Sequence, residues 1–203
     1  MALKLADAKP DEVTDMVGLV DHVISRIYES GAQDPLVKFD LGCGKTPMEG
    51  FRGVDLNCDA DVKADLFDGS WDFTPDDSVD FLYSSHFVEH VPDWNRFFEA
   101  AWRKVKAGGY FLITTPYGSS NRAWQDPDHK QVIFEERYLY LSRGWLEMNQ
   151  LTHYSAKVDF EVTNMWPIWN QDFVGLNAEA QGYAMKHYRN AVDDLTVLLR
   201  CKK

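Results

Sequence analysis

Three segments in the first third of the chain carry residues suited to binding a nucleoside-like ligand. Gly42 and Gly44, in DLGCG, allow a tight turn and a close approach of backbone to ligand. Asp55, in GVDLN, can accept two hydrogen bonds from the vicinal hydroxyls of a ribose. Asp65, in ADLFD, can accept one from an exocyclic adenine amine while Leu66 packs on the base. Each aspartate alone is more simply a solvated loop carboxylate, but their order after successive predicted strands favours a binding site.

The elements that must position these residues follow from the hydrophobic pattern. Apolar residues at helical spacing predict a leading helix that begins near Pro10 and ends at Gly31, a second over 93–108 and a third over 134–149. Short apolar or alternating runs predict strands at 36–41, 53–56, 62–66, 79–84, 110–116, 157–166 and 193–203. A polar loop at 117–131 and a polar, aromatic segment at 170–192 complete the chain.

Strands that alternate with helices predict a three-layer α/β domain around a mostly parallel sheet. The last two strands are expected to form an antiparallel pair at one edge. In such sheets the ligand lies beyond the carboxyl ends of the strands, so the residues just after each strand carry the most weight. For the fourth and fifth strands these residues are SSHFVEH and TPYGSSN.

Composition narrows the class of partner. The chain of 203 residues has 21 basic and 32 acidic side chains, and its net charge of −11 disfavours nucleic acid and anionic membranes as main partners. Its three cysteines, Cys43, Cys58 and Cys201, match neither a zinc-site nor a disulfide spacing. No signal-peptide core and no run of about 18 apolar residues is found. We therefore expect a cytoplasmic protein with no bound metal.

The chain resembles a class I S-adenosylmethionine-dependent methyltransferase from about residue 36 to its end. FDLGCG is similar to the first motif of that family, GVDLN to the second, and ADLFD to the adenine-contacting segment. VDFLYSSHFVEHV and WRKVKAGGYFLITTP resemble the motifs around the fourth and fifth strands. The resemblance implies a Rossmann-like, seven-stranded fold and S-adenosyl-L-methionine as cofactor. It implies these cofactor-binding residues: Asp40, Gly42, Cys43, Gly44, Asp55, Leu56, Asp65, Leu66, Ser85 and His86.

The connection after LGCG is unusually short. Only eight residues, including Pro47 and Gly50, separate Gly44 from Gly53, whereas parallel neighbours normally need a crossover of a dozen residues or more. An irregular loop over 45–52 is therefore expected in place of the first crossover helix. Gly50 and Phe51 resemble the pattern of a small branch of the family, often phage-encoded or associated with glycan gene clusters.

A dinucleotide-binding site is the nearest competing interpretation. That fingerprint requires a third glycine, where this chain has Pro47, and an acidic residue about 20 residues beyond the turn. Asp55 lies only 13 residues after Gly42. A nicotinamide cofactor is therefore disfavoured.

His129 is the candidate general base. Methyl transfer is an in-line displacement, so the protein mainly aligns the nucleophile and excludes water, and a base helps where the nucleophile is a hydroxyl. His129 lies in QDPDHK, after the fifth strand, and a similar D-P-x-H-K stretch recurs in the same branch of the family. A loop histidine with a structural role is an equal alternative. Glu89 and His90, in SHFVEH, are expected to be structural.

Residues 117–192 are expected to form the acceptor side. Trp124 stands in a polar loop where a flat ring would suit stacking on a sugar or aromatic acceptor, and Tyr117 and Asp126 are further candidates for acceptor binding. Cys43 is expected to be a small residue beside the cofactor, since nothing accompanies it as a base.

These observations predict one methyltransferase domain over 1–203, with a leading helix within 1–34 and an acceptor-side loop and cap over 117–192. The predicted reaction is O-methylation of a small molecule or glycan hydroxyl. The alternative is a non-catalytic S-adenosylmethionine-binding partner or sensor protein. O- against N-methylation, the acceptor itself and the oligomeric state are left open.

Overall fold

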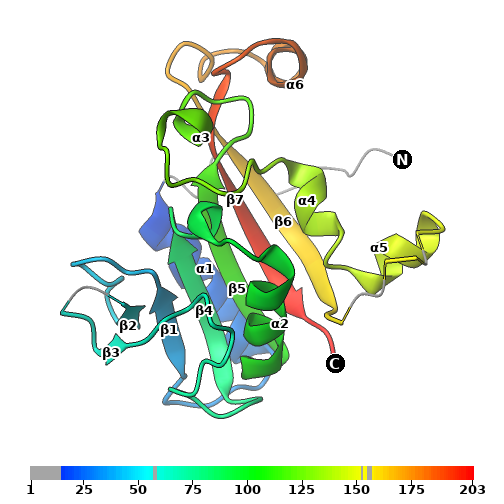
Figure 1. Cartoon of the computed structure of the whole chain (residues 1–203). Helices are drawn as coiled ribbons and strands as arrows, with labels where there is room; N and C mark the ends of the chain where they lie inside the picture. The colour runs from blue at the N-terminus through cyan, green and yellow to red at the C-terminus, as the bar shows by residue number, and fades with distance from the viewer. Residues whose placement is uncertain (1–14, 57–58, 152, 155–156) are drawn as a thin grey trace.

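The computed structural model describes residues 15–56, 59–151, 153–154 and 157–203. They form a sheet of seven strands in the order β3-β2-β1-β4-β5-β7-β6 (Figure 1). β1 to β5 are parallel, and β7 runs antiparallel to both β5 and β6. Figure 1 shows α1 behind the sheet and α2 in front of it. The predicted three-layer, Rossmann-like fold is thereby confirmed.

Each predicted strand has a counterpart in the sheet. Their bounds are β1 Lys38–Leu41, β2 Arg52–Asp55, β3 Val62–Lys63, β4 Val79–Ser85, β5 Val105–Pro116, β6 Phe160–Trp169 and β7 Val192–Cys201. The central strands β4 and β5 are buried along almost their whole length. Burial on both faces explains why these strands read as continuous apolar runs and not as alternating ones.

The leading helix α1 (Met16–Glu29) begins where the side chain of Asp15 accepts a hydrogen bond from the Gly18 amide, which is an N-cap. Its buried face consists of Leu19, Val20, Val23 and Ile27, which pack in one hydrophobic cluster with residues of β4 and β5. Residues 1–14, where the helix was expected to begin, lie outside the described part of the chain.

The prediction that the second helix extends to Gly108 is wrong. Helix α2 (Trp94–Lys104) ends four residues earlier, and Val105 adopts an extended conformation and pairs with Val79 of β4. The buried Lys104 ammonium donates to the Thr74 carbonyl oxygen at 2.8 Å and lies 2.8 Å from an Asp76 carboxylate oxygen. These tertiary contacts and strand pairing fix the boundary, and local sequence does not carry that information.

The predicted helix over 134–149 is two helices, α4 (Glu135–Leu139) and α5 (Arg143–Met148). The break occurs because the Leu141 carbonyl accepts a hydrogen bond from the Phe160 amide of β6, while the Ser142 side chain caps α5. Two further helices lie in segments expected to be irregular: α3 (Arg122–Gln125) and α6 (Ala178–His187).

The short connection between β1 and β2 contains no helix, as predicted. The buried Asp40 carboxylate accepts the Met48 amide at 2.8 Å, and the Phe51 amide donates to the Met48 carbonyl at 3.0 Å. Gly50 has a φ of +76°, a conformation that a side chain disfavours, and Phe51 is buried after it. The loop is therefore held by one hydrogen bond to a buried carboxylate, one backbone hydrogen bond and the buried Phe51 ring.

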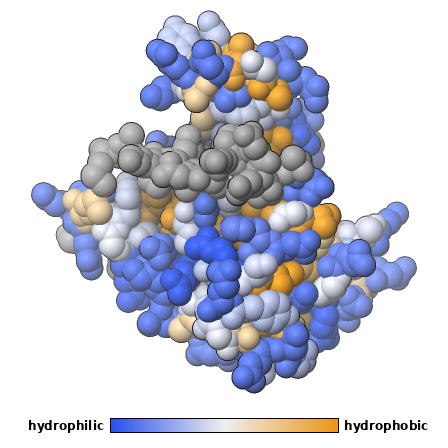
Figure 2. Space-filling model, turned by 180° about the vertical axis from the view of Figure 1, so that it is seen from behind, coloured by the Kyte–Doolittle hydropathy of each residue, from blue (hydrophilic) through white to orange (hydrophobic). Residues whose placement is uncertain are grey.

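Hydrophilic residues cover most of the rear face of the molecule in Figure 2, in keeping with the net charge of −11. Apolar residues are visible at the top of that view, at the level of α6, and again below the grey atoms. Val174 and Leu176, in the segment before α6, are exposed. Within the described residues, no helix has the length and apolar character needed to cross a bilayer.

Candidate functional site

The two glycines after β1 adopt the backbone that the predicted turn requires. Gly42 has a φ of +69° and Gly44 of +58°. A Cβ on Gly42 would lie 2.2 Å from the Phe87 ring, so only glycine fits there. A Cβ on Gly44 would meet no atom within 4 Å. The second glycine therefore exposes backbone to an open cradle, which suits a cofactor that approaches the main chain.

Two carboxylates hold this turn, by different contacts. Asp55, at the end of β2, is half-buried and accepts the Gly44 amide at 3.1 Å. Asp40 is 4% exposed, and burial raises the pKa of its carboxyl to about 6. Its contact with the Met48 amide ties it to the short loop. Asp55 thus lies at the strand end where a ribose is expected, while Asp40 holds the loop between β1 and β2.

After β3 the structure brings forward a residue that the sequence analysis missed. Leu66 is 3% exposed, so its side chain lies in the core and not on the surface. The Leu66 carbonyl accepts a hydrogen bond from the Trp71 indole N–H at 3.1 Å. The neighbouring Phe67 is 38% exposed and stacks on Phe87, with ring centroids 5.5 Å apart. The apolar surface exposed after β3 is therefore that of Phe67, which packs on Phe87. An aromatic residue directly after Asp-Leu was the available signal.

The remaining predicted cofactor residues lie at the same edge of the sheet. Leu56 is exposed just after β2, Cys43 is half-buried between the two glycines, and Ser85 ends β4. The Asp65 side chain accepts the Phe67 amide at 2.8 Å, which positions the segment after β3. Together with Gly44 and Asp55 these residues fit an adenosine-type cofactor.

His86 directly follows β4 and has a φ of +53°, a conformation uncommon for a side-chain-bearing residue. Its amide donates to the Thr114 carbonyl at 2.9 Å, which fixes the turn. The half-exposed imidazole has Nδ1 3.5 Å from Glu89 Oε1 and Nε2 4.0 Å from Asp194 Oδ2. Hydrogen bonding to Glu89, the largest cause, raises the pKa of His86, and burial opposes that rise.

His129 approaches the same carboxylate from another segment. Its Nδ1 lies 3.1 Å from the Ala123 carbonyl oxygen, and its Nε2 lies 4.0 Å from Glu89 Oε1 and 3.9 Å from Asp126 Oδ2. The imidazole is only 10% exposed. The amides of Lys130 and of the next residue both donate to the Glu89 carbonyl, so the loop is fastened to the 3₁₀ helix η1 (Val88–His90). The structure thus joins His86, Glu89, His129 and Asp194 into one histidine–carboxylate cluster.

The predicted acceptor residues differ in their surroundings. Trp124 is 62% exposed and its indole donates to the Gly118 carbonyl at 2.9 Å, so one face remains at the surface. Asp126 is exposed beside His129. Tyr117 is buried, and its hydroxyl donates to Glu135 at 2.9 Å. Burial, then the Glu135 charge, raises the pKa of Tyr117 far above its ordinary value. Tyr117 therefore offers little surface to an acceptor.

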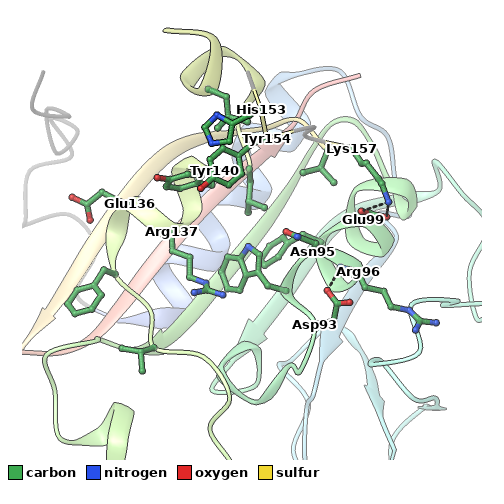
Figure 3. A pocket seen from close by; sticks show the side chains of 17 residues that line it. Asp93, Asn95, Arg96, Glu99, Glu136, Arg137, Tyr140, His153, Tyr154 and Lys157 are labelled. Atoms are coloured by element: carbon green, nitrogen blue, oxygen red, sulfur yellow. Dashed lines mark hydrogen bonds and ion pairs between the residues drawn. The ribbon is translucent and has the colours of Figure 1, made fainter. Parts of the chain in front are cut away.

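One hollow lies near these elements, and another lies apart from them. A polar cavity of about 600 Å³ is lined by Ser120, Asn121, Arg122, Asn170, Asp172, Phe173, Arg189, Asn190 and Asp193. The Arg122 guanidinium is 2.6 Å from Asp194, whose carboxylate faces His86, so this cavity adjoins the histidine–carboxylate cluster. A groove of about 1100 Å³ lies elsewhere, between α2, α4 and the segment before β6, with Arg137 over the Trp94 ring (Figure 3).

A mostly parallel sheet with a glycine turn after β1, a carboxylate at the end of β2 and partly exposed aromatic residues after β3 and β4 is the arrangement expected of a methyltransferase with a nucleoside cofactor. The profile of the methyltransferase domain family matches residues 6–165, and the chain belongs to this family. Family membership confirms the prediction of a methyltransferase domain. S-adenosyl-L-methionine is the methyl donor that this membership implies.

Similar proteins of known structure share this fold. A SAM-dependent methyltransferase from Archaeoglobus fulgidus superposes with a TM-score of 0.57 at 19% identity, over 90% of this chain and 93% of that chain. The putative methyltransferase of Haloferax volcanii, solved with its Trm112 activator, gives 0.54 at 17% identity, over 91% and 88%. Phosphoethanolamine N-methyltransferase 2 of Caenorhabditis elegans is 25% identical over 109 residues, which are 54% of this chain and 24% of that protein. The present chain thus covers about a quarter of that relative.

Proposed function

We propose that the protein transfers the methyl group of S-adenosylmethionine to a hydroxyl of a polar small molecule or glycan. The histidine–carboxylate cluster beside the polar cavity carries this proposal. A hydroxyl is a weak nucleophile and benefits from a proton acceptor, whereas an amine needs only an exposed lone pair. Two histidines tied to buried carboxylates, next to a cavity lined by amides, carboxylates and arginines, suit a hydroxyl-rich acceptor.

The cofactor contributes a methyl group already activated by a positive sulfonium. The chain contributes binding and alignment. The Gly44 backbone borders the open cradle, Asp55 offers a carboxylate to the ribose, and Phe67 offers an aromatic face to the adenine. Residues 117–192 are proposed to bind the acceptor, while the residues after β1 to β4 bind the cofactor.

Two histidines are candidates for the proton acceptor. His129, the residue proposed from sequence, has Nδ1 against the Ala123 carbonyl, which leaves the lone pair on Nε2. That lone pair faces Glu89 and Asp126, and the ring is 10% exposed. His86 is more accessible, with 39% of its side chain exposed, and directly follows β4. The greater exposure of His86 supports it as the alternative base.

Methylation of a phosphorylated amine is a second candidate function. It is suggested by the name of the C. elegans relative, phosphoethanolamine N-methyltransferase 2. Arg122 and Arg189 both line the polar cavity and could bind a phosphate. The two functions differ in what the histidines contribute, because an amine acceptor needs no general base.

The test is a transfer assay with cofactor labelled in its methyl group, run against nucleotide sugars, small alcohols and phosphoethanolamine. O-methylation predicts labelled product from a hydroxyl compound and a loss of about 10² to 10⁴ in rate for the His129→Ala or the His86→Ala variant. His22→Ala, on the exposed face of α1, is the matched control. Label on an amine, with both variants fully active, would refute the hydroxyl proposal. Tight binding of the cofactor with no transfer to any compound would favour the non-catalytic partner or sensor.

A further inference from the structure

We propose that Glu89, His90 and His129 form a binding site for a divalent transition-metal ion such as Zn²⁺. One potential ligand atom from each of the three side chains lies within 4.8 Å of the others. Two of these residues are consecutive in η1, and the third comes from the loop after α3. Nothing in the sequence spacing indicates this set, since the third residue is distant in the chain and only the fold brings it to η1.

The distances leave room for an ion. Nε2 of His129 is 4.0 Å from Glu89 Oε1, too long for the direct hydrogen bond of about 2.8 Å that a charged pair makes when nothing separates it. Two donors bound tetrahedrally at about 2.0 to 2.1 Å from zinc lie ~3.4 Å apart. The observed separation is therefore closer to that of a metal-bridged pair. Small rotations of the Glu89, His90 and His129 side chains suffice to bring their ligand atoms to metal-binding distance.

The groups around the three side chains match those that usually orient metal ligands. Nδ1 of His129 is 3.1 Å from the Ala123 carbonyl oxygen, an arrangement in which Nδ1–H donates and the lone pair stays on Nε2. Metal-binding histidines commonly donate their second N–H to a backbone carbonyl in this way. His86 holds Glu89 Oε1 from the other side at 3.5 Å, and the rings of His90 and His129 meet edge to face at 4.7 Å.

An independent observation points to a cation. Glu89 is 2% exposed, and within the described residues its Oε2 atom is buried without a hydrogen-bond partner. A buried carboxylate oxygen left unsatisfied is costly, more so when charged. Asp126 adds a second negative charge 3.9 Å from Nε2 of His129. A divalent ion would satisfy the orphan oxygen and neutralise this local charge.

Two imidazoles and one carboxylate are the donors found in catalytic zinc sites, which keep further positions open. In the proposed function, on which this step rests, an open position would bind the acceptor hydroxyl and lower its pKa. Nε2 of His129 would then be a metal ligand, and His86 would be the proton acceptor. The metal thereby assigns different tasks to the two candidate bases.

The binding test uses the full chain, stripped of metal with a chelator, in the absence of cofactor and acceptor. Calorimetric titration with Zn²⁺ is expected to show one ion per chain, and Co²⁺ is expected to give visible absorption bands of a protein-bound ion. His90→Ala and His129→Ala should each weaken Zn²⁺ binding by at least tenfold. His22→Ala and His153→Ala remove exposed histidines outside the set and should bind as the wild type does.

Binding that is absent in the wild type, or unchanged in the His90 and His129 variants, overturns the inference. Should a variant fail to fold, wild-type protein labelled with ¹⁵N in histidine replaces it. The rings of His90 and His129 should then show the large ring-nitrogen shifts of metal-bound imidazole on Zn²⁺ addition, and such shifts in other histidines but not in these two are the opposing result. Because no methyl transfer is measured, metal binding without transferase activity would refute only the proposed function.

Discussion

At the scale of single residues, Asp40 and Asp55 are close in sequence but differ in what they bind and in how far they are buried. Asp55 and Asp40 both hold the turn after β1, but Asp40 is nearly inaccessible to solvent. An isolated sequence shows that an acidic residue stands at each position. It does not show burial, which decides whether the charge faces a ligand or the backbone of a loop.

The pKa of Asp40 leads to a prediction about stability. Burial raises it from 3.8 to about 6, so the folded chain binds a proton more tightly than the unfolded chain does. The resulting stabilisation is present below about pH 4 and is lost as the pH rises through about 6. The Asp40→Asn variant retains an oxygen for the Met48 amide, and its amide has no proton to lose as the pH rises. Between these pH values wild-type stability should fall relative to the variant, by up to about 3 kcal/mol. The free energy of unfolding of both proteins is measured by urea denaturation at each pH. The same pH dependence in the wild type and the variant would contradict the prediction.

His86 supplies a prediction about activity. Its pKa is raised above 6.5, chiefly by hydrogen bonding to Glu89, and a general base must be neutral to accept a proton. If His86 is the base, kcat should increase with pH with a midpoint above 6.5. Asp194→Asn removes a charge that raises this pKa and should move the midpoint to lower pH. Steady-state kinetics across the pH range would measure both, and an identical midpoint in the two proteins would count against His86.

At the scale of elements, the periodic segments were predictable and their ends were not. All seven strands were expected, because apolar runs bounded by polar or glycine-containing segments leave few alternatives. The C-terminus of α2, the break between α4 and α5, and helices α3 and α6 depend on tertiary contacts such as the Phe160 amide with the Leu141 carbonyl. In the candidate site, likewise, some residues could be proposed from sequence and others depend on tertiary contacts. Gly42, Gly44 and Asp55 were proposed from motifs, but the exposure of Phe67 and the proximity of His129 to Glu89 required the fold.

The short loop after β1 can be tested through the strand on which it packs. A Cβ on Gly53 would lie 2.7 Å from Cys43 Sγ and 3.0 Å from Pro47. Gly53→Ala should therefore displace the loop, reduce stability by about 1 to 3 kcal/mol and weaken cofactor binding. Gly182→Ala in α6 meets no atom within 4 Å and should stabilise the chain by up to ~1 kcal/mol, with cofactor affinity unchanged. Urea unfolding and calorimetry would check both, and equal cofactor affinity in the two variants would show that the loop does not shape the site.

At the scale of the whole molecule, one sheet links the cofactor edge to the acceptor side. β1 and β2 hold the turn, His86 directly follows β4, and β7 carries Asp194 next to the polar cavity. The two hydrophobic clusters lie on opposite sides of this sheet and both include residues of β4, β5 and β7. A ligand bound at the turn is therefore expected to stabilise the fold as a unit.

This continuity gives the last prediction. S-adenosylhomocysteine, the demethylated cofactor, at one hundred times its dissociation constant should stabilise the folded chain by about 2.7 kcal/mol. For a domain of this size that corresponds to a rise in Tm of roughly 5 to 10 °C. NADH should give no rise in Tm, because Pro47 stands where a dinucleotide fingerprint has glycine.

The Asp55→Ala variant should bind S-adenosylhomocysteine at least tenfold more weakly, a loss of about 1.4 kcal/mol. Its Tm should therefore rise less than that of the wild type at the same ligand concentration. Asp59→Ala, an exposed neighbour, is the matched control. Equal shifts in both variants would remove Asp55 from the cofactor site, and a larger shift with NADH would overturn the cofactor assignment itself.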